Sequence, residues 1–473
     1  MDIAKNLENF VVKISSVADS VMFCNITGLP AFKIPFLVAW IAIGGLYFTY
    51  KFRFISISRL FYSLRLAFSS KLEKSQIASL KGKDISTSKK IVLTGIGEAI
   101  DVSAIFGVVT AVMIGGPGVL FWMLIAGFVS MPIRFVEVSL GHMTRVYDAK
   151  TGQTHGGPQR YISVIFRAIK LPGLGRFASI LFSICVIMST FFSPQINQTM
   201  NIARYIVPSF QEYILLSSTL IAILVIMIVL SGFRSITIIV SKMVKIMSVL
   251  YVLVCGVIIF QNAGKIPGAM QLIFHDAFSF RAVEGSLFFI AILGCKRTFF
   301  SCDVGQGVSS IGHVNSANKN SIQEGIISMS GILIITLIAT FCSGMIVVVT
   351  DVYLTEKNDM FAVIGAVNSV NQYLKYSLFV IVPMFAITTA VSWGYFGQKA
   401  FISLFGKKYA NVYFVLLFCA YIMCGVTQDF RVILDVADIF NLSIALPNMI
   451  AVLIGSRFVY KRYRKFLASE AAR

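Results

Sequence analysis

An acidic residue interrupts an apolar stretch near residues 94–113 that is otherwise suited to cross a membrane. Asp101 lies near its middle, beside Ser103 and ahead of Gly107. A carboxylate inside a membrane is costly, so it indicates a functional role. It could bind sodium, carry a proton or pair with a substrate ammonium group. It could also be a structural acid that pairs with a base from another helix.

A second apolar stretch, near residues 283–312, is interrupted in a similar way. It contains two basic residues, one acidic residue and two glycines: Lys296, Arg297, Asp303, Gly305 and Gly307. An unwound backbone at such glycines can offer carbonyl groups to a cation and amide groups to a carboxylate. Alternatively, the basic residues pair with Asp101 or mark a loop, and the glycines permit close helix packing.

Hydroxyl and amide side chains add further candidate ligands. Thr388 and Thr389 are adjacent in the apolar stretch 375–403, and Trp393 lies four residues after Thr389, on the same helical face. Adjacent hydroxyls can bind sodium through oxygen or simply bond to their own helix. Gln198, at the end of another apolar stretch, is either a ligand contact or a link between helices.

These residues must be positioned by helices that cross a membrane. The chain has 473 residues, of which 57% are hydrophobic and only 13% are charged, and its mean hydropathy is +0.82. A spanning helix needs about 20 mostly apolar residues. Eleven stretches qualify: 34–50, 94–113, 116–141, 178–203, 213–231, 236–260, 283–312, 322–350, 375–403, 411–428 and 433–456.

This composition excludes several classes of protein. A soluble domain of ordinary composition is about 25% charged, so this chain has too few charges to cover a globular surface. The eight cysteines form no CxxC pair, and the four histidines show no metal-ligand spacing. Nucleotide-binding and hydrolase motifs are absent from the sequence, so no enzymatic activity and no catalytic cofactor are expected.

The basic residues predict the orientation. Residues 51–90 carry ten basic and two acidic residues, and the segments 142–177 and 457–473 each carry six basic and one acidic. The segment 351–362 carries one basic and three acidic residues. With eleven spans and the N-terminus outside, all basic-rich segments lie in the cytoplasm, as the positive-inside rule requires. The net charge of +20 is therefore attributed to the cytoplasmic segments beside the lipid bilayer, and it does not indicate nucleic-acid binding.

The basic segment after the first span also has an apolar face. Phe54, Ile57, Phe61, Leu64 and Phe68 recur at helical spacing among the basic residues. This pattern predicts an amphipathic helix in the cytoplasmic interface, with a solvated basic linker as the alternative.

The two interrupted spans are the first members of two five-span blocks. Interrupted segments at matching positions indicate a transporter built from inverted repeats, with its site near the midplane of the membrane. The predicted organisation has four parts: an N-terminal segment with the first span and the basic region (1–90), a first five-helix repeat (91–260), a second repeat (261–456) and a basic cytoplasmic tail (457–473).

Several segments resemble the alanine or glycine:cation symporter family, also called sodium:alanine symporters. The run GGPGVLFWMLIAGFVSMPIRFVE followed by GGPQRYI is similar to the family's GGPGA-FWMW run with its K-F-x-E motif and GGPMYYI loop. KRTFFSCDVGQG is similar to KRGLFSNEAGMG, and FAITTAVSWGYFGQKAFISLFG is similar to FAFSTILGWSYYGEK…LFG. The resemblance runs in order from about residue 34 to the end of the last span.

The resemblance implies one extra helix followed by a ten-helix core of the leucine-transporter type. It implies a small amino acid moved inward with sodium, bound between the broken first and sixth core helices. Gln198, Thr389 and Trp393 match positions assigned to the amino acid, and Thr388 matches a sodium-site hydroxyl.

The chain departs from the family pattern at the breaks. Where the family has Gly-Thr-Gly-Asn, this chain has Asp101, Val102, Ser103 and Ala104, so a possible cation ligand is lost. The Asn-Glu pair of the sixth core helix is replaced by Cys302 and Asp303. The resemblance therefore implies a retained scaffold with an altered site.

We therefore expect a secondary active transporter, in a bacterial-type inner membrane, for an alanine- or glycine-like amino acid or related zwitterion. Asp101, Thr388 and Thr389 are the candidate cation ligands, and sodium is the expected coupling ion. Proton coupling or uncoupled transport of a different substrate through Asp101 is an alternative, and a non-transporting sensor on the same scaffold is another.

Overall fold

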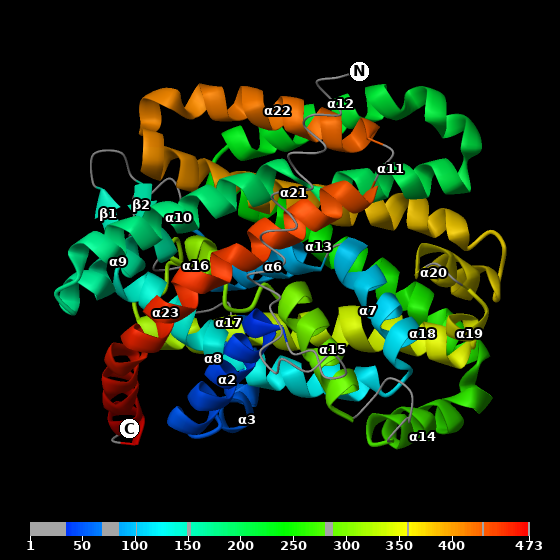
Figure 1. Cartoon of the computed structure of the whole chain (residues 1–473), viewed down its shortest axis with the longest axis horizontal. Coiled ribbons are helices and arrows are strands. Elements are labelled where there is room, and N and C mark those ends of the chain that lie inside the picture. Colours follow the sequence, from blue (N-terminus) through cyan, green and yellow to red (C-terminus); the bar gives the residue numbers. More distant parts are fainter. Residues whose placement is uncertain are drawn as a thin grey trace.

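A computed structural model of the chain describes residues 35–68, 85–100, 102–148, 153–279, 287–356, 359–427 and 430–471. The molecule is a bundle of helices, most of which run in roughly the same direction across it (Figure 1). One small antiparallel hairpin, β1 (Val146–Asp148) and β2 (Gln153–His155), lies at one end of the bundle.

Eight helical segments in the described part of the chain are long and apolar enough to cross a membrane. They are α8 (Val119–Met143), α10 and α11 (Pro172–Phe191 and Pro194–Ile206), η1 and α12 (Pro208–Tyr213 and Ile214–Leu230), α13 (Phe233–Gln261), α17 with η3 and α18 (Ser321–Ile335, Thr336–Cys342 and Ser343–Val349), α21 (Lys375–Phe405), η4 and α22 (Lys407–Tyr409 and Ala410–Val426), and α23 (Phe430–Ala471).

The other three expected spans are present as shorter helices. The first is α2 (Phe36–Lys51), and the second is split into α6 (Ser88–Ala99) and α7 (Val102–Gly115). The seventh is split into α15 (Leu287–Ser301) and α16 (Val308–His313). The expected polytopic all-α membrane fold is confirmed, and two of its spans are broken at the residues where charge and glycine interrupt the apolar pattern.

The remaining elements are short and connect the spans. They are α3 (Ile55–Ser58), α4 (Leu60–Phe68), α9 (Pro158–Ala168), η2 (Ala263–Lys265), α14 (Ile266–Ala277), α19 (Val352–Thr355) and α20 (Asp359–Asn368). In Figure 1, α3, α9 and the end of α23 lie on the left, whereas α14, α19 and α20 lie on the right.

The basic segment after α2 differs from the single amphipathic helix expected there. Arg53 and Phe54 adopt positive φ angles of 54° and 55°, so the chain turns after α2. Arg59 (φ −117°, ψ 13°) then separates two short helices, α3 and α4. The expected apolar face is nevertheless present, because Phe54, Ile57 and Phe61 are 56%, 65% and 82% exposed. The opposite face of α4 packs on α17, where the Ser63 hydroxyl donates to the Ile326 carbonyl at 2.7 Å.

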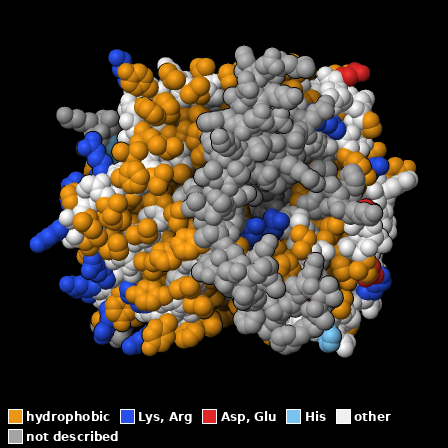
Figure 2. Space-filling view, in the orientation of Figure 1, with side chains coloured by type: hydrophobic (Ala, Val, Ile, Leu, Met, Phe, Trp, Pro, Cys, Tyr) orange, Lys and Arg blue, Asp and Glu red, His pale blue; other side chains and the backbone are white. Residues whose placement is uncertain are grey.

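The surface agrees with a membrane-embedded bundle. Apolar side chains cover much of the face seen in Figure 2. Lysine and arginine side chains gather along its left edge, at the end that holds α3, α9 and the end of α23, and the acidic side chains in view lie at the right edge. Most of the charged groups in this view therefore lie toward the two ends of the spans, with one basic group near the middle of the face.

Candidate substrate and cation site

The break in the first core helix follows from its sequence. α6 begins with an N-cap, where the Thr87 side chain accepts from the Lys90 amide at 3.3 Å, and it ends at Ala99. Ile100 then has an extended backbone (φ −83°, ψ 94°). α7 resumes at Val102, so the helical axis is interrupted beside Asp101, which lies outside the described residues together with the side chain of Ser103.

The break in the seventh span lies in residues 302–307, between α15 and α16. Asp303, Gly305 and Gly307 have positive φ angles of 47°, 82° and 73°. Such angles suit glycine and are unfavourable for other residues, so Asp303 holds a strained conformation that its surroundings must maintain. Cys302 and Asp303 are both buried. The expected unwinding at these glycines is confirmed.

A clamp of polar side chains holds this break in place. The Asn448 amide of α23 donates to the Gly305 carbonyl at 2.6 Å and to Glu137 Oε1 at 2.8 Å. The Tyr161 hydroxyl of α9 donates to Asn448 Oδ1. Gly307 is required here, because a Cβ at this position would lie 2.5 Å from Tyr161 Oη. Three helices therefore fix the unwound backbone through one buried network.

Arg134 adds a charged contact to the same break. This residue lies on α8 and is buried, and its Nη2 donates to the carbonyl of Cys302. Charged neighbours of Arg134 include Glu98 on α6 and Glu137 on its own helix. Glu98 also interacts electrostatically with Asp303. The end of α6 therefore lies near the unwound segment between α15 and α16.

The threonines of α21 behave differently from each other. Thr389 Oγ1 donates to the Gly97 carbonyl of α6 at 3.1 Å, which joins α21 to the broken helix. Thr388 Oγ1 donates to the Phe385 carbonyl of its own helix at 2.9 Å. The Ser392 hydroxyl then donates to the Thr388 carbonyl at 3.0 Å. The last turn of α6 therefore meets a group of hydroxyl oxygens from α21.

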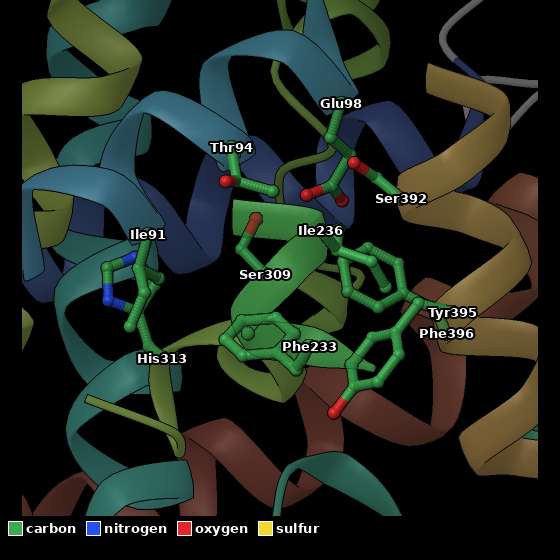
Figure 3. A pocket seen from close by; sticks show the side chains of 12 residues that line it. Ile91, Thr94, Glu98, Phe233, Ile236, Ser309, His313, Ser392, Tyr395 and Phe396 are labelled. Carbon is green, nitrogen blue, oxygen red and sulfur yellow. The ribbon is translucent and has the colours of Figure 1, made fainter. Parts of the chain in front are cut away.

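A narrow cavity of about 10 Å³ lies between α6, α13, α16 and α21. Figure 3 shows Glu98, Thr94, Ser309 and Ser392 around its polar part, with Phe233, Tyr395 and Phe396 along its aromatic wall. The rings of Phe233 and Tyr395 pack with centroids 4.9 Å apart. His313 lies at the far end of the cavity.

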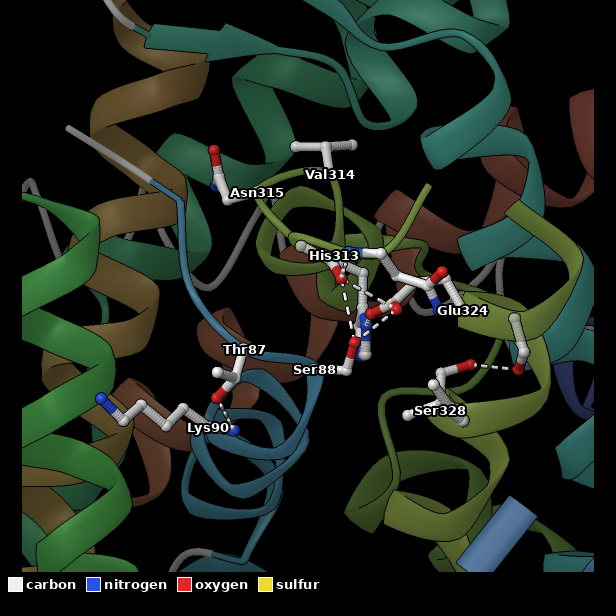
Figure 4. Close-up of polar contacts among 12 residues, drawn as sticks. Thr87, Ser88, Lys90, His313, Val314, Asn315, Glu324 and Ser328 are labelled. Carbon is white, nitrogen blue, oxygen red and sulfur yellow. Dashed lines mark hydrogen bonds and ion pairs between the residues drawn. The ribbon is translucent and has the colours of Figure 1, made fainter. Parts of the chain in front are cut away.

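A buried network closes the far end of this cavity. Glu324 accepts from the Ser88 hydroxyl at 2.7 Å and the Ser316 hydroxyl at 2.9 Å, and its Oε1 lies 2.6 Å from His313 Nδ1 (Figure 4). The backbone of residues 85–87 pairs with this region through a bridge between Ser86 and Ser316. The start of α6 is thereby tied to the end of α16 and the start of α17.

The remaining predicted residues lie around these elements. Gly107 faces Arg297 of α15, whose Nη1 would be 3.5 Å from an added Cβ. Gln198 is buried on α11, which packs against α21 and α7. Trp393 is buried, its ring contacts Phe396, and its carbonyl accepts from Thr190 at 3.1 Å. Their roles in binding remain predictions.

Sequence reasoning missed Glu98 and Asn448 and gave no role to Arg134 and Glu137. Arg134 and Glu137 were visible as charges in a span and as part of the motif similar to K-F-x-E. Glu98 lies three residues before Asp101 in the same apolar stretch, so it carried the same signal. Asn448 had none, because a single asparagine in a span does not show which break it contacts.

Comparisons with known proteins place the chain in a family. A model of the sodium:alanine symporter family matches residues 18–473. The sodium/alanine symporter AgcS of Methanococcus maripaludis is 28% identical over 437 residues, covering 91% of this chain and 94% of that protein. An uncharacterized transporter of Haemophilus influenzae is 32% identical over 435 residues, covering 88% and 89%. The amino-acid carrier protein AlsT of Bacillus subtilis is 26% identical, covering 94% and 92%.

A solved structure shares the fold. The crystal structure of MhsT in complex with L-phenylalanine matches 80% of this chain and 99% of its own, with a TM-score of 0.52 and 16% sequence identity. This likeness supports the expected ten-helix core of the leucine-transporter type. Together with the match along nearly the whole chain, it shows that the chain is a transporter and belongs to the sodium:alanine symporter family.

Proposed function

We propose that this protein carries a small amino acid across the membrane together with sodium. The observation that carries the proposal is the meeting of two helix breaks with α21. The last turn of α6 receives the Thr389 hydroxyl on its Gly97 carbonyl, while the unwound segment between α15 and α16 lies within electrostatic range of Glu98. Helices broken at the same depth offer free backbone carbonyl and amide groups, which suit a cation and a carboxylate respectively.

The cation is assigned to the contact between α6 and α21. Its oxygens are the Gly97 carbonyl and the hydroxyls of Thr388 and Thr389, with Asp101 completing the site from the first break. Sodium suits a site of hard oxygen ligands. When sodium binds, the Thr389 hydroxyl turns its lone pair to the ion in place of donating to Gly97. Removing that hydroxyl therefore weakens sodium binding more than removing the Thr388 hydroxyl, which is held by its own helix.

The amino acid is assigned to the space between the two breaks. We assign Ser103, Gly107, Cys302 and Asp303 of the two broken helices to it, and the structure describes Cys302 and Asp303 as buried residues of the unwound segment. Gln198 and Trp393 complete the assignment from α11 and α21. The clamp of Glu137, Asn448 and Tyr161 supports this role, because it fixes the unwound backbone before any substrate arrives.

The orientation follows from the distribution of charge. Lysine and arginine side chains gather at the end of the bundle with α3, α9 and the end of α23, which we assign to the cytoplasm of a bacterial-type inner membrane (Figure 2). The other end carries the exposed pair of Lys265 and Asp351, 2.7 Å apart. In this orientation the N-terminus is outside, and the first membrane span in each of the repeats 91–260 and 261–456 is a broken helix. The cavity beside Glu98 then lies on the cytoplasmic side of the breaks.

Uptake into proteoliposomes tests the proposal. Purified protein is reconstituted, and uptake of radiolabelled alanine and glycine is measured with an inward sodium gradient, an inward proton gradient and no gradient. We expect uptake driven by sodium that is lost when a sodium ionophore dissipates the gradient. Uptake driven by the proton gradient alone, or ligand binding without flux, would contradict the proposal.

A further inference from the structure

One oxygen of the Glu98 carboxylate is left without a hydrogen-bond partner in the contacts described above. Glu98 is 2% exposed, and its Oε1 has no hydrogen-bond partner in the part of the chain that the structure describes. A buried, unpaired carboxylate is costly, so such a group is retained where something binds to it or where it loses its charge. The side chain lines the cavity between α6, α16 and α21 (Figure 3).

The charged groups nearest to Glu98 do not neutralise it. Asp303 has the same sign and is 5% exposed, so it strengthens the negative potential. Arg134 has the opposite sign, but its charge also acts on Glu137 of its own helix. One guanidinium therefore faces Glu98 and Glu137, while Asp303 adds a third buried carboxylate, and the region attracts a further positive charge.

The lining of the cavity supplies further oxygen atoms beside Glu98. Ser392 donates its proton to the Thr388 carbonyl, so its oxygen lone pairs are available to a cation. Ser309 is 6% exposed and lines the same cavity from α16. In Figure 3 the Ser309 hydroxyl points toward the Glu98 carboxylate, and Ser392 approaches it from α21. One carboxylate and two hydroxyls from three helices form a donor set that suits a hard monovalent cation.

The rest of the lining argues against a zwitterion as the occupant. An amino acid brings a carboxylate as well as an ammonium group, and that carboxylate needs a donor or a positive charge. The lining residues that the structure describes include no lysine or arginine, and His313 Nδ1 among them lies 2.6 Å from Glu324 Oε1. Phe233, Tyr395 and Ile236 form the opposite wall. A bare cation satisfies Glu98 without leaving a second buried charge unpaired.

We propose that Glu98, Ser309 and Ser392 form a second sodium site, on the α16 side of the helix break. The proposal rests on the proposed function, because it takes sodium as the coupling ion. The site differs from the one assigned at Gly97 in its ligand from α6, which is a side-chain carboxylate here and a backbone carbonyl there. The hydroxyl of Thr389 approaches the backbone of α6, whereas the Glu98 side chain extends into the cavity.

Occupation of this site would couple the ion to movement of the helices. Its ligands come from α6, α16 and α21, so a bound ion draws together the last turn of α6 and the two helices beside it. When the cavity opens at its far end, water replaces the protein ligands and the ion is released. The second site thus predicts that more than one sodium ion accompanies each turnover.

Equilibrium binding of radiolabelled sodium to the purified full-length protein tests the second site. Binding is measured without amino acid for the wild type, Glu98→Gln and Thr389→Val. Asp276→Asn is the control, because Asp276 is also buried (2% exposed) but accepts from the Gly118 amide at 2.9 Å, away from the cavity. We expect two ions per wild-type or Asp276→Asn molecule and one per Glu98→Gln molecule. The Hill coefficient for sodium-driven uptake falls accordingly in Glu98→Gln.

If the Glu98→Gln protein does not fold, Ser309→Ala tests the same site. Ser309→Ala keeps the carboxylate and removes one ligand, and it should weaken one class of sodium site by about tenfold while leaving the other unchanged. Two ions bound to a folded Glu98→Gln protein would overturn the second site. Weaker sodium-free alanine binding with unchanged sodium binding would also overturn it, by assigning Glu98 to the substrate ammonium. If the wild type shows no sodium-driven uptake, the proposed function itself fails.

Discussion

Gly307→Ala tests whether the polar clamp holds the unwound segment between α15 and α16. Gly307 has a φ of +73°, and an added Cβ would lie 2.5 Å from Tyr161 Oη and 2.7 Å from Asn448 Oδ1. Neither oxygen can move easily. Tyr161 donates to Asn448, whose amide in turn donates to Glu137 at 2.8 Å and to the Gly305 carbonyl at 2.6 Å.

The expected cost is the sum of a backbone effect and a packing effect. A left-handed backbone costs a residue with a Cβ about 1–2 kcal/mol relative to glycine. Insertion of a carbon into a packed and hydrogen-bonded site costs about 1–3 kcal/mol more. We therefore expect Gly307→Ala to lower the free energy of unfolding by about 2–5 kcal/mol.

Two matched variants separate these effects. Gly305 also has a positive φ, of 82°, but an added Cβ would lie 3.2 Å from the flexible Met449 side chain, so Gly305→Ala should show the backbone effect alone. Tyr161→Phe removes the oxygen nearest to the new Cβ, and in the double variant it should recover about 1 kcal/mol relative to additivity. Unfolding in mixed micelles, followed by the fluorescence of the three tryptophans, measures all four proteins.

Equal destabilisation by Gly307→Ala and Gly305→Ala, with no coupling to Tyr161→Phe, would show that the clamp is loose. The clamp would then be a consequence of the break and would not hold it. Sodium-driven uptake gives a second readout, because a displaced break should slow uptake in Gly307→Ala before the protein loses its fold.

Three further predictions concern individual side chains. Thr389→Val should raise the sodium concentration for half-maximal uptake by about tenfold, whereas Thr388→Val should change it less than threefold, since the Thr388 hydroxyl bonds its own helix. Arg134→Lys should retain most uptake, as the similar family motif has lysine there, but Arg134→Gln should destabilise the fold by about 3–5 kcal/mol, visible as a lower melting temperature. Glu324→Gln should cost about 3 kcal/mol of unfolding free energy, because the buried carboxylate accepts from three side chains. Glu470→Gln, which breaks a half-exposed 2.9 Å ion pair, should cost less than about 1 kcal/mol in the same melting assay.

The sequence was sufficient to predict the fold. Spans and breaks depend on local composition, so apolar length, interrupting charge and glycine located all eleven spans and both breaks. The helix expected after the first span was wrong in its continuity. Helical periodicity does not reveal that the backbone leaves helical geometry at Arg59, between α3 and α4, because any residue type fits that pattern until the backbone angle is known.

The site could be predicted only in part, because its contacts join residues that are far apart in the chain. Thr388 and Thr389 are indistinguishable by type and spacing, yet one binds Gly97 and the other its own helix. The Asn448 clamp depends on how α23 packs over α8 and the second break. Glu98 was accessible to the same argument as Asp101, since both are acids in one apolar stretch.

The charges around the breaks explain how a transporter scaffold can accept an altered first break. Where the similar family segment has an asparagine, this chain has Ala104, so one neutral oxygen ligand is lost. Glu98 and Asp303 instead place two buried carboxylates near Arg134, whose Nη2 is engaged with the Cys302 carbonyl. A carboxylate attracts a cation far more strongly than an amide does, but in the membrane it is stable only while a cation or a bound proton neutralises it. Sodium binding should therefore stabilise this protein strongly, and removal of sodium should lower its melting temperature more in the wild type than in Glu98→Gln.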